Sequence, residues 1–208
     1  MKANATRHRR IIVKTPSAPS GVGIGVMGGT FNPPHMGHVT VAQTALKRLG
    51  LSKLWWLVTP GNPLKSRDGL SPTSSRMAAA QSLARDRRMV MTAFEDELGS
   101  PYTAQTLSFL RTRYPTTRFV WVMGADNLAT FHRWQHWQGI AHTMPFVVID
   151  RPGWRLKALA SPAARALSKY RVPEERAALL TRSSAPCWAF LSTRLSELSS
   201  TELRRDGL

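Results

Sequence analysis

The chain has 208 residues, with 29 Lys+Arg against 12 Asp+Glu and a formal net charge of +17. Seven Trp, seven Phe and a hydrophobic content of 42% exclude a mainly disordered chain. Cys187 is the only cysteine, which excludes internal disulfides and cysteine-rich zinc sites, and no apolar run approaches the ~20 residues that span a bilayer. We therefore expect one soluble, cytoplasmic domain without a secretion signal.

The positive charge predicts an attraction to phosphate, whether on nucleic acid, on lipid or on a nucleotide. Part of this charge lies in residues 1–21, which we expect to form a flexible basic tail; residues 22–208 would form a single domain. No DNA- or RNA-reading motif accompanies the charge, so we expect no specific nucleic acid and no membrane as a partner. A non-catalytic nucleic-acid-binding protein remains a remote alternative.

Short apolar runs alternate with helical patterns along the rest of the chain. This alternation is typical of an α/β fold with a mostly parallel sheet and helices on both faces, in which ligands bind at the carboxyl ends of the strands. The predicted strands are Val22–Met27, Leu54–Thr59, Val90–Phe94, Arg118–Met123, Phe146–Ile149 and Cys187–Leu191. The predicted helices are Gly37–Leu49, Thr73–Asp86, Thr103–Tyr114 and Pro162–Leu167, with weaker patterns near 126–140 and 173–180.

Gly23, Gly25 and Gly28 match the G-x-G-x-x-G pattern of dinucleotide-binding proteins. That pattern needs a strand before it and a helix that starts within it. Here Pro33 and Pro34 follow closely and prevent an immediate helix. The glycines are therefore expected inside the first strand, and an oxidoreductase is disfavoured.

The segment from Gly28 to His38 reads Gly-Gly-Thr-Phe-Asn-Pro-Pro-His-Met-Gly-His and directly follows the first predicted strand. Gly28 and Gly29 would let the backbone approach a ligand and adopt positive φ. His35 and His38 bracket the start of a helix, so both imidazoles could donate to the oxygens of one phosphate beside the helix N-terminus. Zinc binding or ordinary helix capping are the alternatives for these histidines, but the joint pattern favours a nucleotide phosphate site.

The same segment resembles the signature of the His-x-Gly-His nucleotidyltransferases, which have a Rossmann-like fold. The end of the chain, from Ser199 through Arg204, resembles their second signature, Ser-Ser-Thr-x-(Ile/Leu)-Arg. Three further blocks resemble bacterial nicotinate-nucleotide adenylyltransferases in particular: residues 100–106, 123–134 and 150–153. The resemblance extends over most of the chain, from about Gly25 to Arg204.

This resemblance implies adenylyl transfer from ATP to nicotinate mononucleotide, which gives deamido-NAD and pyrophosphate. The alternative acceptors in the same fold are nicotinamide mononucleotide and phosphopantetheine. Mg²⁺ is expected to enter on the ATP phosphates rather than in a protein cage, and a homo-oligomer is possible. His132 and His136, at a spacing of four, could bind zinc only with a third ligand.

The resemblance also implies roles for individual residues. The residues expected to act on the triphosphate in catalysis are His35, His38 and Arg204. Those expected to bind ATP are Gly28, Gly29, Thr30, Phe31, Gly37, Gly124, Asp126, Ser199, Ser200 and Thr201. Those expected to bind the acceptor are Lys65, Thr103, Trp134 and Arg151. For Lys65 a solvated lysine, and for Trp134 a partly buried aromatic packed with Trp137, are the alternative interpretations.

Overall fold

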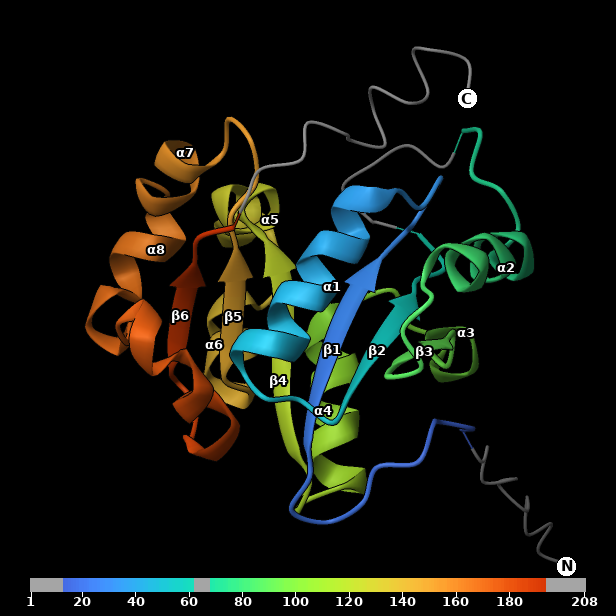
Figure 1. Ribbon diagram of the computed structural model, residues 1–208, viewed down its shortest axis with the longest axis horizontal. Coiled ribbons are helices and arrows are strands. Elements are labelled where there is room, and N and C mark those ends of the chain that lie inside the picture. The colour runs from blue at the N-terminus through green and yellow to red at the C-terminus, as the bar shows by residue number, and fades with distance from the viewer. Residues whose placement is uncertain (1–12, 62–67, 194–208) are drawn as a thin grey trace, which may run out of the picture.

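A computed structural model describes residues 13–61 and 68–193 of the chain. Its centre is a six-stranded parallel sheet (Figure 1). The strand order is β3-β2-β1-β4-β5-β6, so the direction of winding reverses between β1 and β4. The strands are β1 (Gly23–Gly29), β2 (Lys53–Val58), β3 (Met89–Thr92), β4 (Arg118–Gly124), β5 (Phe146–Ile149) and β6 (Trp188–Leu191).

Helices connect consecutive strands. The α-helices are α1 (Met36–Arg48), α2 (Thr73–Leu83), α3 (Glu95–Leu98), α4 (Thr103–Arg113), α5 (Ala125–Thr130), α6 (Trp137–Thr143), α7 (Arg155–Leu159) and α8 (Pro162–Ala166). Three 3₁₀ segments complete the described elements: η1 (Phe131–Arg133), η2 (Ser168–Tyr170) and η3 (Glu174–Arg182). The predicted strands and the four main predicted helices are confirmed to within three residues at each end.

Two hydrophobic cores cover the two faces of the sheet. Successive residues of β2 point to opposite faces, so Trp55 packs in one core and Trp56 in the other. Apolar residues of α4, α5, α6 and α8 belong to the first core, and those of α1, α2 and η3 to the second. The layers are visible in Figure 1, where α1 lies in front of the sheet and α4 and α6 lie behind it. Burial on both faces explains why these strands read as continuous apolar runs.

Residues 13–21 differ from the expected flexible tail. Val13 is buried in the first core, and the backbone N–H of Lys14 donates to a carboxylate oxygen of Glu97 at 2.8 Å. The Thr117 hydroxyl donates to the carbonyls of Ala18 and Pro19. These residues therefore pack against the domain, and any tail is shorter than the expected 21 residues; residues 1–12 lie outside the described ranges.

The two weaker helical patterns of the sequence correspond to shorter elements in the structure. The segment near 126–140 forms α5, η1 and α6 rather than one helix, and the segment near 173–180 is part of η3. Two short helices, α3 and α7, are too brief to leave a readable period in the sequence. No described helix combines the length and apolar character that crossing a bilayer requires.

Candidate active site

The candidate site lies at the carboxyl ends of β1 and β4, where the winding of the sheet reverses. This reversal point is where ligands bind in open α/β sheets. Gly28 and Gly29 end β1, and Gly124 ends the neighbouring β4. The topology therefore brings the end of β1 and the end of β4, which are distant in the sequence, to the same end of the sheet.

Gly28 and Gly29 serve close packing rather than an unusual backbone conformation. A Cβ on Gly28 would lie 2.7 Å from Cη2 of Trp121, and one on Gly29 would lie 3.0 Å from the ring of Phe31. Neither glycine has a positive φ, so that part of the prediction is wrong. The positive φ occurs two residues later, at Phe31.

Phe31 is a buried, left-handed residue with φ 47°. Such a conformation costs a non-glycine residue roughly 1–2 kcal/mol and needs support from its surroundings. Its ring stacks on Trp56 at a centroid distance of 5.0 Å and contacts His38 edge-on at 4.9 Å. The loop between β1 and α1 is thus anchored by an aromatic side chain beneath it.

His35 and His38 cap α1 in a reciprocal arrangement. Nδ1 of His35 accepts the backbone N–H of Gly37 at 3.1 Å, and Nδ1 of His38 accepts the backbone N–H of His35 at 3.2 Å. A nitrogen that accepts carries no proton, so each neutral ring is protonated on Nε2. The ring centroids are 3.8 Å apart. The helix cap therefore fixes the tautomer of two adjacent imidazole donors.

The N-terminus of α1 is also electrostatically suited to an anion. Its first turn contains no acidic residue, and its positive dipole end points toward the loop after β1. The described structure thus combines capping and the proposed phosphate site in the same two histidines. Capping, which the sequence offered as an alternative to phosphate binding, is compatible with it.

Asp126 and Arg151 form the second part of the site. Nη1 of Arg151 donates to Oδ2 of Asp126 at 3.1 Å, and both side chains are largely shielded from solvent. The other carboxylate oxygen, Oδ1, is buried without a hydrogen-bond partner among the described residues. Gly124 allows this approach, because a Cβ there would lie 2.9 Å from Cδ of Arg151. The pair leaves one carboxylate oxygen that could accept a hydroxyl.

The turn after β5 presents Arg151. Asp150 is buried; it accepts the backbone N–H of Arg151 at 2.9 Å and Nε of Arg155 at 2.7 Å. Gly153 has φ 72°, which closes the turn. Arg151 lines a small cavity together with Gly37 of α1. The structure therefore places Arg151 beside the residues expected to bind ATP.

Thr103 and Trp134, expected on the acceptor side, lie on separate elements. Thr103 is the first residue of α4, whose N-cap residue, Tyr102, makes no side-chain cap. Trp134 follows η1, is half-buried and packs edge-on against Phe131 at 5.5 Å. Trp137 packs against the same ring at 5.9 Å. The packing role considered for Trp134 is therefore present, together with an accessible part of the ring.

Two buried ionisable residues, Glu95 and Arg76, are not identified by sequence motifs. Glu95, at the start of α3, accepts the Thr106 hydroxyl at 2.5 Å, and burial raises its pKa to about 7. Arg76 of α2 is 3% exposed and donates to backbone carbonyls at the ends of β1 and β2. Arg76 lies four residues before Ala80, on the same face of α2, but only the structure shows that this face is buried.

Comparison with known proteins identifies the family. The cytidylyltransferase-like family model matches residues 26–206. A relative from Rhizobium meliloti (strain 1021), named probable nicotinate-nucleotide adenylyltransferase, is 55% identical over 181 residues, which is 87% of this chain and 96% of the relative. The chain belongs to the nicotinate-nucleotide adenylyltransferase family.

Other members of the family agree with this assignment. A probable nicotinate-nucleotide adenylyltransferase from Cereibacter sphaeroides (strain ATCC 17023) is 50% identical over 184 residues, covering 88% of this chain and 97% of the relative. Among solved structures, Plasmodium falciparum nicotinic acid mononucleotide adenylyltransferase complexed with NaAD has a TM-score of 0.68 at 16% identity, covering 88% and 83% of the two chains. The Rossmann-like nucleotidyltransferase fold expected from the sequence is confirmed.

Several residues expected from the family signatures lie outside the described ranges. These are Lys65, Ser199, Ser200, Thr201 and Arg204. Among the described residues, no group of three or more His, Cys, Asp or Glu side chains could hold a metal ion. His132 and His136 do not share a helix face, because η1 ends at Arg133 and His136 is left-handed.

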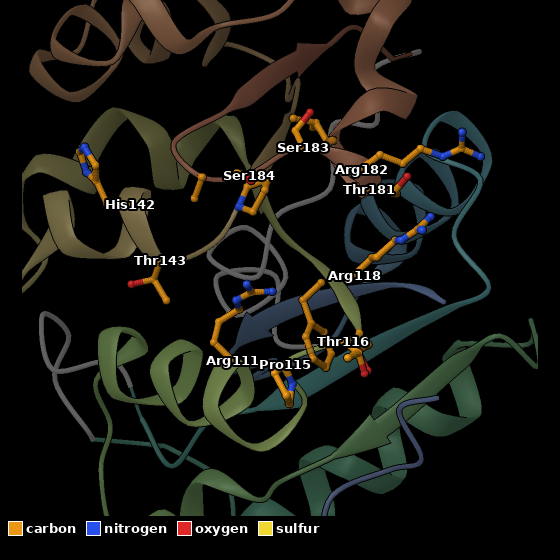
Figure 2. A pocket seen from close by; sticks show the side chains of 15 residues that line it. Arg111, Pro115, Thr116, Arg118, His142, Thr143, Thr181, Arg182, Ser183 and Ser184 are labelled. Carbon is orange, nitrogen blue, oxygen red and sulfur yellow. The ribbon is translucent and has the colours of Figure 1, made fainter. Parts of the chain in front are cut away.

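A cavity of about 290 Å³ lies at the opposite end of the sheet, where β4 begins (Figure 2). Its arginines have a local explanation: Arg111 and Arg182 each occupy the last turn of a helical segment, where a positive charge compensates the negative end of the helix dipole. Arg118 begins β4, whose seven residues separate this cavity from the site by roughly 20 Å. The cavity is therefore not part of the adenylyltransferase site.

Proposed function

We propose that the protein transfers the adenylyl group of ATP to nicotinate mononucleotide, forming deamido-NAD and pyrophosphate. The observation that carries this proposal is the pair of imidazoles at the start of α1, whose Nδ1 atoms both accept backbone N–H groups and whose ring centroids are 3.8 Å apart. Family membership at 50–55% identity supports the same reaction.

The chemistry requires positioning more than a protein nucleophile. The acceptor phosphate already carries an anionic oxygen, which attacks the α-phosphorus of ATP while the bond to the bridging oxygen of the β-phosphate breaks. His35 and His38 would donate through Nε2–H to the triphosphate oxygens, where negative charge develops. The N-terminus of α1 supports the same charge.

The adenosine end of ATP would lie between β1 and β4. Backbone groups of residues 28–31 and Gly37 would line this region, and Oδ1 of Asp126 is a buried acceptor suited to a ribose hydroxyl. Arg151 holds Asp126 from the other side. We therefore reassign Arg151 from the acceptor to the support of the ATP site.

The acceptor would bind on the other side of the histidines. The first turn of α4, starting at Thr103, offers backbone N–H groups without a side-chain cap or an acidic residue, which suits the ring carboxylate. The accessible part of Trp134 could stack on the pyridine ring. Lys65 and Arg204 remain predictions: Lys65 would bind the negative charge of the acceptor, and Arg204 would bind the triphosphate of ATP.

ATP would enter as its Mg²⁺ complex, with the ion held by phosphate oxygens. Asp126 and Asp150, which follow β4 and β5, are paired with Arg151 and Arg155, and Oδ1 of Asp126 alone has no hydrogen-bond partner among the described residues. These carboxylates suit arginine pairing better than a dedicated magnesium cage. The cytoplasmic location and a homo-oligomer remain predictions.

Position-labelled ATP tests the bond that is broken. With nicotinate mononucleotide as acceptor, an α-labelled phosphate should appear in the dinucleotide, and a γ-labelled phosphate should appear only in pyrophosphate. Transfer of the γ-label to the acceptor, or release of labelled AMP without dinucleotide, would refute adenylyl transfer.

A further inference from the structure

We propose that Arg76 is a positioning residue. It holds the loop between β1 and α1 (residues 30–35, the ATP loop) in its productive conformation and joins this loop to the segment that leads into α2 (residues 68–72). This inference rests on the proposed function only in that residues 28–31 contact ATP. The juxtaposition itself is a property of the described structure: one buried guanidinium contacts three segments that are distant in the sequence.

The guanidinium of Arg76 makes four hydrogen bonds. Nη1 donates to the carbonyl of Thr30 at 2.6 Å and to the carbonyl of Thr59 at 2.8 Å. Nε donates to the carbonyl of Ser71 at 2.8 Å, and Nη2 donates to the Thr73 hydroxyl at 3.0 Å. The loop after β1, the end of β2 and the approach to α2 therefore share one side chain.

All four of these acceptors are neutral. Burial lowers the pKa of Arg76, and the nearby Asp96 opposes that effect without hydrogen bonding to it among the described contacts. An arginine nevertheless stays charged at neutral pH. Burying a charged guanidinium that is only 3% exposed costs free energy. The four hydrogen bonds to neutral acceptors therefore indicate that Arg76 serves to position the segments it contacts.

The hydrogen bond from Arg76 to the Thr30 carbonyl sets the direction of the N–H group of the next residue, Phe31. In a planar trans peptide the C=O and the following N–H point in opposite directions. Because the Thr30 carbonyl points to Arg76, the N–H of Phe31 points away from α2. Phe31 is also the residue with φ 47°, a conformation that persists only where the surroundings enforce it. Arg76 thus fixes a peptide group in the loop expected to contact ATP.

Asn32 provides a second tie between the same segments. Its Nδ2 donates to the carbonyl of Gly69 at 2.9 Å, and its Oδ1 accepts the backbone N–H of Ser71 at 3.2 Å. In Figure 1 the segment that leads into α2 descends at the right, on the side of the sheet where β2, β3 and α2 lie. The ATP loop and the start of α2 therefore behave as one unit, with Arg76 at its centre.

Arg76→Lys is the decisive variant, because lysine keeps the charge but not the planar fork that spans several acceptors. We expect kcat with ATP and nicotinate mononucleotide to fall about tenfold or more, because a misplaced loop loses orientation. The KM for nicotinate mononucleotide should change less than threefold. Two controls match it: Arg85→Lys makes the same change at an exposed site just past α2, and Ala80→Gly weakens α2 without touching the loop.

Thermal unfolding should be measured for every variant, and kinetics compared where each is fully folded. A kcat for Arg76→Lys within threefold of wild type would overturn the proposal. An equal loss in Ala80→Gly at a comparable unfolding temperature would also overturn it, because stability alone would then explain the effect.

If Arg76→Lys does not fold, Thr73→Val removes one acceptor and should lower kcat about two- to fivefold; an unchanged kcat would contradict the proposal. If the wild-type protein shows no turnover with nicotinate mononucleotide, the proposed function fails separately. Binding of a non-hydrolysable ATP analogue then tests Arg76 by itself. We expect at least fivefold weaker binding in Arg76→Lys, and equal binding would refute the inference.

Discussion

Glu95 offers a quantitative test of the buried contact between α3 and α4. The residue is 2% exposed; its carboxyl group accepts the Thr106 hydroxyl through Oε1 and has no partner on Oε2 among the described residues. Burial raises its pKa from an ordinary value of 4.5 to about 7. The substitution Glu95→Gln keeps the shape and the acceptor for Thr106 but removes the titrating proton.

The consequence for stability follows from proton binding. Below pH 4.5 the carboxyl is protonated in both folded and unfolded chains. Between pH 4.5 and about 7 the unfolded chain ionises while the folded protein keeps its proton, so the free energy of unfolding falls as the pH rises. Each pKa unit is worth about 1.4 kcal/mol, so the loss reaches about 3 kcal/mol above pH 7. Glu95→Gln should not show this loss.

Urea unfolding followed by tryptophan fluorescence, at pH 4.5 and at pH 8, measures the effect. The stability difference between Glu95→Gln and wild type should shift by about 3 kcal/mol in favour of the variant on going from the lower to the higher pH. Comparing the two pH values cancels any packing cost of the amide. The exposed Glu175→Gln is the matched control and should show no shift. A shift below about 1 kcal/mol for Glu95→Gln would refute the reasoning.

Further predictions concern the end of β1, the start of α1 and the N-terminal segment. His38→Ala should lower kcat about a hundredfold or more with an unchanged circular dichroism spectrum, because one transition-state donor is lost; unchanged turnover would exclude that role. Gly28→Ala should lower the free energy of unfolding in urea by about 1–3 kcal/mol, because the new Cβ meets Trp121, and wild-type stability would contradict this packing. Deletion of residues 1–20 should cost about 1–2 kcal/mol through the loss of buried Val13 while turnover of the folded protein persists; an unchanged unfolding temperature would argue against the contact.

Much of the fold could be predicted because its signals are local. The six strands are short apolar runs, since both faces of the sheet are covered, and α1 has a clear apolar stripe. The histidine pair was identified for a similar reason: His35 and His38 act within a single helix start, so their spacing carries the information. Neighbouring glycines suggested a flexible backbone, but the bulk of Trp121 and Phe31 explains them better.

The remaining features depend on partners that are distant in the sequence. Arg76 binds the carbonyls of Thr30 and Thr59, which any residue type would supply, so no side-chain pattern announces the contact. Val13 is buried only because the first core extends to the N-terminal segment. Arg151 is placed by Asp126 across two strands, which a family signature alone does not specify.

Pyrophosphate release from Mg²⁺·ATP, with nicotinate mononucleotide and nicotinamide mononucleotide compared side by side, tests the central claim most directly. A clear preference for nicotinate mononucleotide is the predicted result, since the uncapped start of α4 favours a ring carboxylate over an amide. Equal use of both acceptors would contradict the proposed recognition at Thr103. The absence of release with either would contradict adenylyl transfer to a pyridine mononucleotide.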